Sequence, residues 1–349
     1  MKSLFTTFKQ IWKIDDLRNR ILLTLGIILI YRVGSFVILP GINAEALANQ
    51  SQGGGGLGDL LSLFTGGAFS RASVFALGIM PYISASIIMQ LLGVAVPSIQ
   101  KMQKEGESGR QKINQYTRFL TIAIAGFQAP GYLSTTVVNV QGAVPNPTTF
   151  WWVSSIIIIT SATLFIMWLG ELITEKGIGN GISLIIMIGI ISRLPSAFIQ
   201  EFVGRIDGAG GMVMLLVELV FLLLVIAGTV ALIQAVRRVP VQYAKRISGI
   251  QGLGSGARQF IPLKVNAAGV MPIIFAQAIM FVPLYIAQAA NVENPNTFLI
   301  ELGNIRGVYY NVLFSIVIIL FTYFYTAITV NPTQMADDLK RNGGFVPGI

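Results

Sequence analysis

Eight apolar stretches of about twenty residues constrain this chain more than any other feature. Each is long enough to cross a bilayer as a helix, because the hydrocarbon core is about 30 Å thick and a helix rises about 1.5 Å per residue. They lie at about 21–39, 71–96, 119–138, 151–173, 182–199, 212–236, 265–289 and 308–330. Only 11% of the 349 residues are charged, whereas soluble domains carry about 25%. The sequence therefore predicts an all-α, polytopic membrane protein.

A twelve-residue pattern occurs twice in these stretches, at 78–89 and again at 269–280. Seven of the twelve positions are identical at an offset of 191 residues (269 − 78). Each copy places a proline, Pro81 or Pro272, in an expected spanning helix, where it should bend the helix and free a carbonyl group. About five spans separate the copies, so the second should be inverted in the membrane. Chance similarity between apolar segments is the alternative.

The distribution of positive charge predicts the orientation of the chain. With a cytoplasmic N-terminus, 19 of the 24 Lys and Arg residues fall in segments on the cytoplasmic side, as the positive-inside rule requires. Two five-helix halves would make ten helices, of which about eight are present, so we expect an incomplete second half. The expected organisation is an amphipathic cytoplasmic segment at 1–20, a first half at 21–200 and an incomplete second half at 201–349.

The composition removes several kinds of chemistry. The chain has no cysteine and no histidine, which excludes disulfides, thiolate or imidazole metal sites and histidine acid–base catalysis. The glycine-rich turn at 175–181 lacks the Gly-Lys-Ser/Thr sequence of a phosphate-binding loop. We therefore expect no enzyme activity, no cofactor and no metal. A secondary transporter, whose one acidic candidate is Glu218, and a structural scaffold both stay open.

Two short features have the character of functional elements. An apolar segment at about 57–65 is too short to span and has glycines on both sides, at 53–56 and at Gly66 and Gly67. It is predicted to be re-entrant or interfacial and free to move, or alternatively a static packing element. Arg32 interrupts the first span, where it is either functional or reaches to the membrane surface.

Isoleucines stand out at the kinked spans. One pair lies one helical turn apart at Ile79 and Ile83, and a second pair at Ile182 and Ile186. Ile274 matches Ile83 in the repeat. A ring of these side chains in mid-membrane could form a narrow hydrophobic constriction. The alternative is that they face lipid or neighbouring helices. The basic loops at 97–118 and 237–264 would bind anionic lipid or dock a large acidic partner, including RNA.

Several ordered motifs give the chain a resemblance to a known family. They are 70–86 (SRASVFALGIMPYISAS), 104–110 (KEGESGR), 115–118 (QYTR), 168–171 (WLGE), 177–183 (GIGNGIS), 243–246 (YAKR), 262–266 (PLKVN) and 345–349 (FVPGI). The chain resembles the SecY family, the channel-forming subunits of the bacterial Sec protein translocase. The resemblance covers the whole chain. That family continues with a further loop and two spans, so the resemblance also implies that this chain is incomplete.

The resemblance implies a role for each candidate residue. A plug would comprise Leu57, Asp59, Leu60, Leu61, Leu63 and Phe64. The pore ring would comprise Ile79, Ile83, Ile182, Ile186 and Ile274. Spans two, three, seven and eight would form a lateral gate with polar positions Ser84, Gln128 and Asn266. Cytoplasmic docking would use Arg237, Arg238, Lys245, Arg246, Arg258 and Lys264.

The resemblance also implies the function and its partners. The chain would be a passive protein-conducting channel of the bacterial cytoplasmic (inner) membrane. It would pass nascent and secretory polypeptides across the membrane and release signal sequences and membrane segments sideways into lipid. SecE and SecG would be its membrane partners. The energy would come from the SecA ATPase or a ribosome, because nothing in the sequence indicates nucleotide binding.

Overall fold

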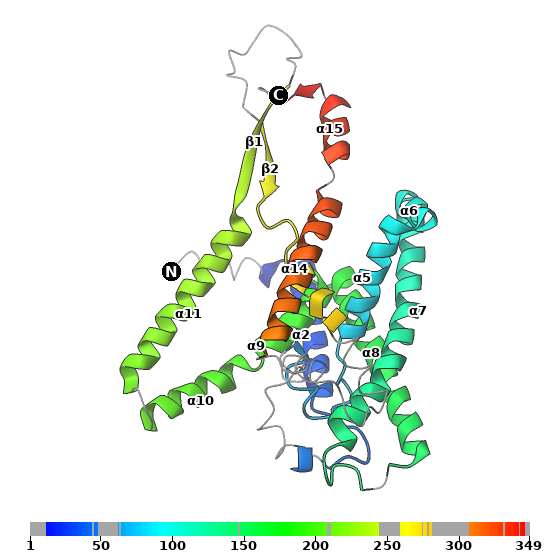
Figure 1. Cartoon of the computed structure of the whole chain (residues 1–349), viewed down its shortest axis with the longest axis vertical. Helices are drawn as coiled ribbons and strands as arrows, with labels where there is room; N and C mark the ends of the chain where they lie inside the picture. The colour runs from blue at the N-terminus through cyan, green and yellow to red at the C-terminus, as the bar shows by residue number, and fades with distance from the viewer. Residues whose placement is uncertain are drawn as a thin grey trace. The chain divides into compact units, whose positions relative to one another are not determined.

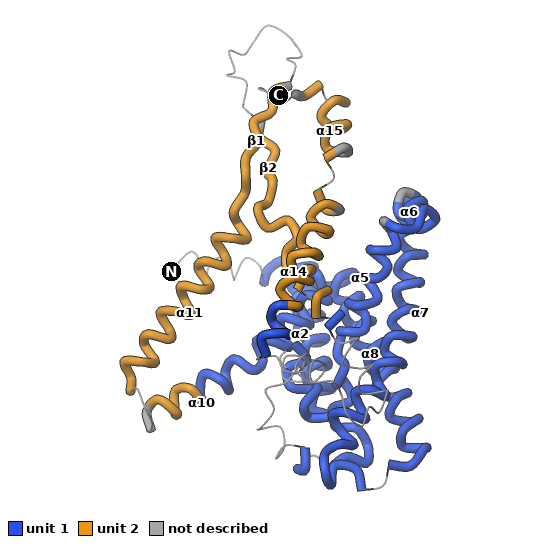
Figure 2. The backbone as a smooth tube through the Cα atoms, viewed as in Figure 1, with its two compact units in different colours: residues 1–200, 278–312 blue, residues 201–277, 313–349 orange. Residues whose placement is uncertain are grey.

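A computed structural model describes most of the chain. The described residues are 12–43, 45–47, 62, 64–145, 147–207, 211–243, 259–273, 275–277, 279–280, 307–330, 332–341 and 343–345. The chain divides into two compact units, one comprising Met1–Gln200 with Ala278–Val312 and the other Glu201–Gln277 with Leu313–Ile349 (Figure 2). Each unit is described by itself.

The first unit is a bundle of helices. In chain order these are α2 (Asp15–Gly34), α5 (Met80–Ala95), α6 (Pro97–Lys104), α7 (Glu107–Tyr132), its π-helical continuation η1 (Leu133–Val138), α8 (Thr149–Lys176) and α9 (Gly181–Ile191) (Figure 1). Helix α5 packs along α7, and α8 packs against α7, α9 and α2. Helix α10 (Leu194–Asp207) begins in this unit and ends in the other.

Side-chain caps set the starts of two of these helices. The Thr148 hydroxyl accepts a hydrogen bond from the Trp151 N–H at 3.2 Å, where α8 begins. The Asn180 side chain accepts one from the Ser183 N–H at 3.0 Å, where α9 begins. Each cap satisfies an N–H group that has no partner within its helix. Asn180 therefore fixes the side of the α8–α9 turn from which α9 begins.

The core of the first unit ties α7 to the turns before α5. Tyr132 is fully buried, and its hydroxyl donates to the Phe69 carbonyl oxygen at 2.8 Å. The two rings also meet edge to face, with centroids 4.7 Å apart, an arrangement that aromatic pairs favour. Leu39, Leu133 and Ile159 are buried in the same cluster.

The second unit contains a small sheet as well as helices. Its elements are α11 (Gly211–Gln234), β1 (Val236–Tyr243), β2 (Gln259–Lys264), most of α14 (Val308–Thr329), α15 (Pro332–Arg341) and β3 (Gly344–Phe345). The strands are ordered β2-β1-β3 and all pairs are antiparallel. The expectation of an all-α chain is wrong here. These strands are too polar for a spanning segment, and their backbone groups are satisfied by pairing instead.

The predicted spans are confirmed only as a set of apolar helices. Within the described residues, α8, Gly181–Arg205, α11 and Val308–Ala327 are long and apolar enough to cross a membrane. A fifth is added if Met80–Gly93 and Pro97–Gln103, bent by 103°, form one broken span. Helix α2 begins and ends several residues earlier than the predicted 21–39. Helix α7 starts at Glu107, inside a segment expected to be a polar loop.

The prediction for the second span is wrong in its first half. A continuous helix was expected from residue 71, bent at Pro81, but residues 65–79 form successive turns and α5 begins at Met80. Pro81 therefore lies in the first turn of the helix. Proline fits this position well because the N–H that it lacks would have no partner there. The proline starts the helix and does not kink it.

Candidate functional site

The turns at 65–79 are anchored to the chain that follows α2. The Leu39 N–H donates to the Ala72 carbonyl at 3.0 Å, and the Val74 N–H donates to the Val37 carbonyl at 2.7 Å. Ile38 and Ser73 form the antiparallel bridge between these two bonds. The short ladder holds the segment that leads from the predicted plug to α5.

The last residues of the predicted plug fit between two glycines. A methyl group at Gly189 on α9 would collide with the carbonyl oxygen of Phe64. A Cβ at Gly78, just before α5, would lie 3.0 Å from Cγ2 of Thr65. Gly189 thus lets the Phe64 backbone approach closely, and Gly78 leaves room for the Thr65 side chain. This segment is in contact with α9 on one side and with the start of α5 on the other.

The described isoleucines of the predicted pore ring are close in sequence to the two glycines of this contact. Ile79 and Ile83 are 5% and 7% exposed, and they lie at the start of α5 one turn apart. Ile182 and Ile186 are half-buried on α9. Gly78 directly precedes Ile79, and Gly189 follows Ile186 by three residues. The structure therefore places the end of the predicted plug beside the two elements that carry these isoleucines.

Part of the predicted site falls outside the described residues. This applies to Ile274 of the ring, to Leu57, Asp59, Leu60, Leu61 and Leu63 of the plug, and to Lys245, Arg246 and Arg258 of the docking set. Phe64 is the described member of the plug, and it is half-buried.

Two of the predicted gate residues lie on neighbouring helices. Ser84 on α5 and Gln128 on α7 are both half-buried, and these two helices pack against each other. Asn266 belongs to the second unit, where its side-chain oxygen accepts a hydrogen bond from the Gly269 N–H at 3.0 Å. Asn266 thus closes a turn just before the second repeat copy, a role that sequence reasoning missed. Asparagine three residues before a glycine was the available signal.

The two repeat copies share their local geometry. Gly78 and Gly269 both have positive φ, +55° and +61°, a conformation that glycine adopts without strain. In each copy the helix starts two residues later, at Met80 and at Met271. The Gly78 N–H donates to the Phe75 carbonyl at 2.9 Å, the position that corresponds to Asn266. These shared features support a true internal repeat.

The described docking residues lie on the hairpin of β1 and β2. Arg237 and Arg238 are exposed on β1, and Lys264 is exposed at the end of β2, opposite Val236. Antiparallel pairing therefore gathers the three positive charges at the base of one hairpin. Sequence reasoning assigned this region to a loop, although the valines at 236, 239 and 241 favour a strand there.

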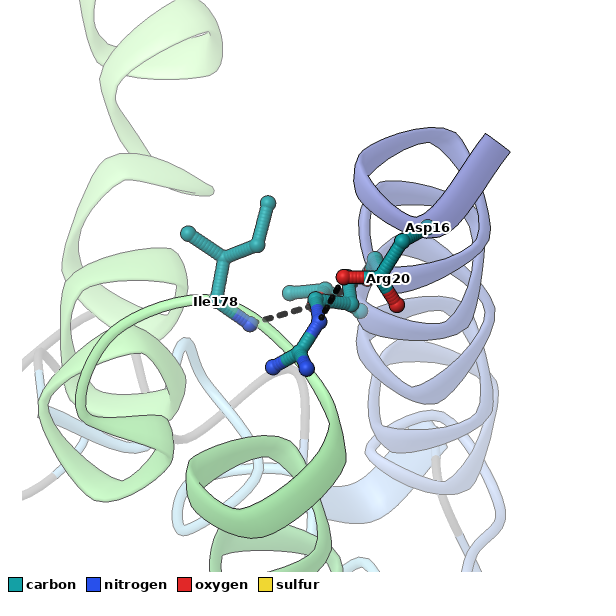
Figure 3. Close-up of polar contacts among 4 residues, drawn as sticks. Asp16, Arg20 and Ile178 are labelled. Atoms are coloured by element: carbon teal, nitrogen blue, oxygen red, sulfur yellow. Dashed lines mark hydrogen bonds and ion pairs between the residues drawn. The ribbon is translucent and has the colours of Figure 1, made fainter. Parts of the chain in front are cut away.

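The turn between α8 and α9 is connected to α2. The Ile178 N–H donates to the Thr24 hydroxyl at 3.2 Å, and this hydroxyl donates to the Arg20 carbonyl at 2.7 Å. The Arg20 side chain in turn pairs with Asp16 at 3.1 Å (Figure 3). A bidentate ion pair joins two neighbouring helices: the Arg118 guanidinium on α7 donates to both carboxylate oxygens of Glu171 on α8, at 3.2 and 2.6 Å.

Comparison with known proteins decides the family. The SecY family model matches residues 73–349. The protein translocase subunit SecY of Streptomyces galbus is 41% identical over 359 residues, which cover 99% of this chain and 82% of that protein. The chain belongs to the SecY family.

Solved structures of the family share the fold at low sequence identity. One is a SecY protein whose plug domain stabilises the closed state of the translocation channel. It has a TM-score of 0.57 and 19% identity, and the match covers 95% of this chain and 78% of that one. Another is Sec61 in the canine ribosome-channel complex from the endoplasmic reticulum. It has a TM-score of 0.60 and 18% identity, with 92% and 75% covered.

Proposed function

We propose that this chain is the central pore subunit of the Sec translocon in the bacterial cytoplasmic membrane. It acts as a passive channel for secretory polypeptides. Membership of the SecY family supports this function, since the relatives are named protein translocase subunits. The repeated glycine turn before Met80 and Met271 supports two inverted halves, and the positive-inside rule favours a cytoplasmic N-terminus.

The observation that carries the proposal is the contact of the plug's end with both isoleucine-bearing elements. Phe64 and Thr65 meet Gly189 on α9 and Gly78 before α5. A plug formed by residues 57–65 and held there would seal a pore lined by Ile79, Ile83, Ile182, Ile186 and Ile274. An apolar constriction excludes ions because they cannot shed their hydration there. It also makes no hydrogen bonds to an extended chain, so it passes many sequences.

Partners and lateral release complete the proposal. A signal sequence or membrane segment would part the gate beside Ser84, Gln128 and Asn266 and leave into lipid. The exposed Arg237, Arg238 and Lys264 on the hairpin form a positive surface that suits an acidic partner. The ribosome-bound Sec61 neighbour supports a ribosome in this role, and SecA is the alternative motor. SecE and SecG would be the membrane partners.

The transporter alternative is disfavoured by the position of its acidic candidate. The Glu218 carboxylate forms an ion pair with Arg205, which also pairs with Glu201 at 2.8 Å. A coupling carboxylate needs to exchange a proton or an ion. The Glu218 carboxylate is held by Arg205 instead, and this ion pair joins α10 to α11.

Site-specific photo-crosslinking tests the proposed channel. A photoreactive residue at Ile83, and separately at Ile274, would be tested in the full complex against a secretory polypeptide stalled in transit. Val213 on α11, 77% exposed, is the matched control for a lipid-facing position. We expect adducts at both isoleucines that depend on a working signal sequence, and none at Val213. Absence of adducts at both isoleucines, with crosslinks elsewhere in the complex, would remove the pore assignment.

A further inference from the structure

Three arginines from separate elements meet at Gly66 and Gly67. Arg32 lies in the last turn of α2, Arg71 lies in the turns before α5, and Arg193 lies between α9 and α10. All three belong to the first unit and are half-buried. Positions 32, 71 and 193 are distant in the sequence, so the fold alone brings these charges together.

The partners of these arginines are neutral. Arg32 Nη1 and Arg71 Nη2 both donate to the Gly66 carbonyl oxygen, at 3.2 and 3.1 Å. Both guanidinium groups also lie over the Phe36 ring, 4.8 and 4.4 Å from its centroid. Arg193 Nη2 donates to the Ser70 hydroxyl at 3.3 Å. A carbonyl, a hydroxyl and a ring face supply partial negative charge only.

The cluster has hydrogen-bonding capacity to spare. Nε of Arg71 is buried and has no hydrogen-bond partner in the described part of the chain. Among the described carboxylates, none forms an ion pair with Arg32, Arg71 or Arg193. Like charges held together away from bulk water repel, and a buried donor without a partner is costly. An anion would relieve both.

The two glycines keep this place free of side chains. Both have positive φ, +63° for Gly66 and +87° for Gly67. A Cβ at Gly67 would lie 3.0 Å from Arg193 Nη2 and 3.2 Å from Arg71 Nη1. Two guanidinium groups therefore converge on one point beside the Gly67 backbone.

We propose that Arg32, Arg71 and Arg193 form a binding site for a phosphate-class oxyanion, either free or as the headgroup of a phospholipid. Guanidinium forks match the oxygens of phosphate, and several forks can share one tetrahedral anion. Phe36 is 54% exposed beside the charges, which supplies the apolar flank that a lipid headgroup site needs. The site does not depend on the channel function, and only its leaflet follows from the proposed orientation.

Phosphate titration tests the site directly. The purified full-chain complex in detergent would be titrated calorimetrically with sodium phosphate, against sodium chloride at equal ionic strength. We expect the Arg71→Gln/Arg193→Gln double variant to bind phosphate at least about tenfold more weakly, because two charged donors are lost. Arg20→Gln is the matched control, since Arg20 is exposed on α2 and paired with Asp16. It should leave the affinity unchanged.

A charge-conserving variant and a lipid measurement separate the remaining outcomes. Arg71→Lys/Arg193→Lys keeps both positive charges but removes the bidentate guanidinium groups, so it should bind phosphate with intermediate affinity. Intermediate binding would also show that the variant complex still assembles. Native mass spectrometry with phosphatidylglycerol would count retained lipids. Loss of a retained lipid in the double Gln variant supports the headgroup form. Weaker phosphate binding with an unchanged lipid count supports the free anion. Equal phosphate affinity and lipid count in the Gln, Lys and Arg20→Gln variants would overturn the proposal.

Discussion

Replacing Gly189 with alanine should loosen the end of the proposed plug. The added methyl group would collide with the Phe64 carbonyl oxygen. That oxygen belongs to the backbone and cannot rotate away, so α9 or the 64–65 segment must move. The variant therefore tests whether this contact keeps the channel closed.

The magnitude follows from two opposing effects. Overpacking costs about 1–3 kcal/mol, and a backbone clash lies at the upper end of that range. Alanine in place of a helical glycine returns about 1 kcal/mol of helix propensity. The free energy of unfolding therefore falls by about 2 kcal/mol. Helix α9 is formed whether the plug is docked or not, so the propensity gain does not affect docking, and the clash of about 3 kcal/mol shifts the docked–undocked balance by about 150-fold.

Ion leakage through reconstituted complexes measures the effect. We expect Gly189→Ala to raise the resting conductance of proteoliposomes and to lower the unfolding temperature. Gly26→Ala on α2 is the matched control, because no atom lies within 4 Å of its added methyl group. It should leave conductance unchanged and stability equal or higher. If Gly189→Ala matched Gly26→Ala in both measurements, the contact would have no sealing role.

Two further predictions concern stability. Gly78→Ala and Gly269→Ala should each lower the free energy of unfolding by about 1–2 kcal/mol, because both glycines have positive φ. Gly126→Ala, with open space around it, should not, and equal denaturation midpoints for all three would refute the shared turn. Tyr132→Phe should cost about 0.5–1.5 kcal/mol by removing one of two hydrogen bonds to the buried Phe69 carbonyl, which the Ala72 N–H also reaches at 3.3 Å. Tyr323→Phe at a 77% exposed position should cost less than about 0.5 kcal/mol, and equal losses would refute that reading of Tyr132.

The apolar part of the fold follows from the sequence. The spans expected at 151–173, 212–236 and 308–330 correspond to α8, α11 and α14 within a few residues. Bilayer thickness fixes the length of such helices, so hydropathy alone locates them. The proposed repeat was also visible, because a glycine and a Met-Pro pair recur at the same positions of both segments.

Contacts between distant segments explain what the sequence did not reveal. Helix α2 stops at Gly34 because Val37 and Leu39 pair with the backbone at Val74 and Ala72. The apolar run continues past Gly34, so hydropathy predicts a longer helix. Pairing partners of this kind leave no periodic pattern in either segment.

Arg32 shows the same limit for the candidate sites. The sequence left open whether this charge is functional or reaches to the membrane surface. The structure turns it towards the Gly66 carbonyl, beside Arg71. A single charge in a span carries no record of its neighbours in three dimensions.

The closure of the turn before each repeat copy has an evolutionary consequence. At position 75 the acceptor of the Gly78 N–H is a backbone carbonyl, so substitution of the Phe75 side chain preserves this hydrogen bond as long as the backbone is not disturbed. At position 266 the acceptor is a side chain, and few residue types can replace it. Point mutation can therefore adjust the second copy while the first stays constant. The two turns thus differ in how readily natural variation can change them.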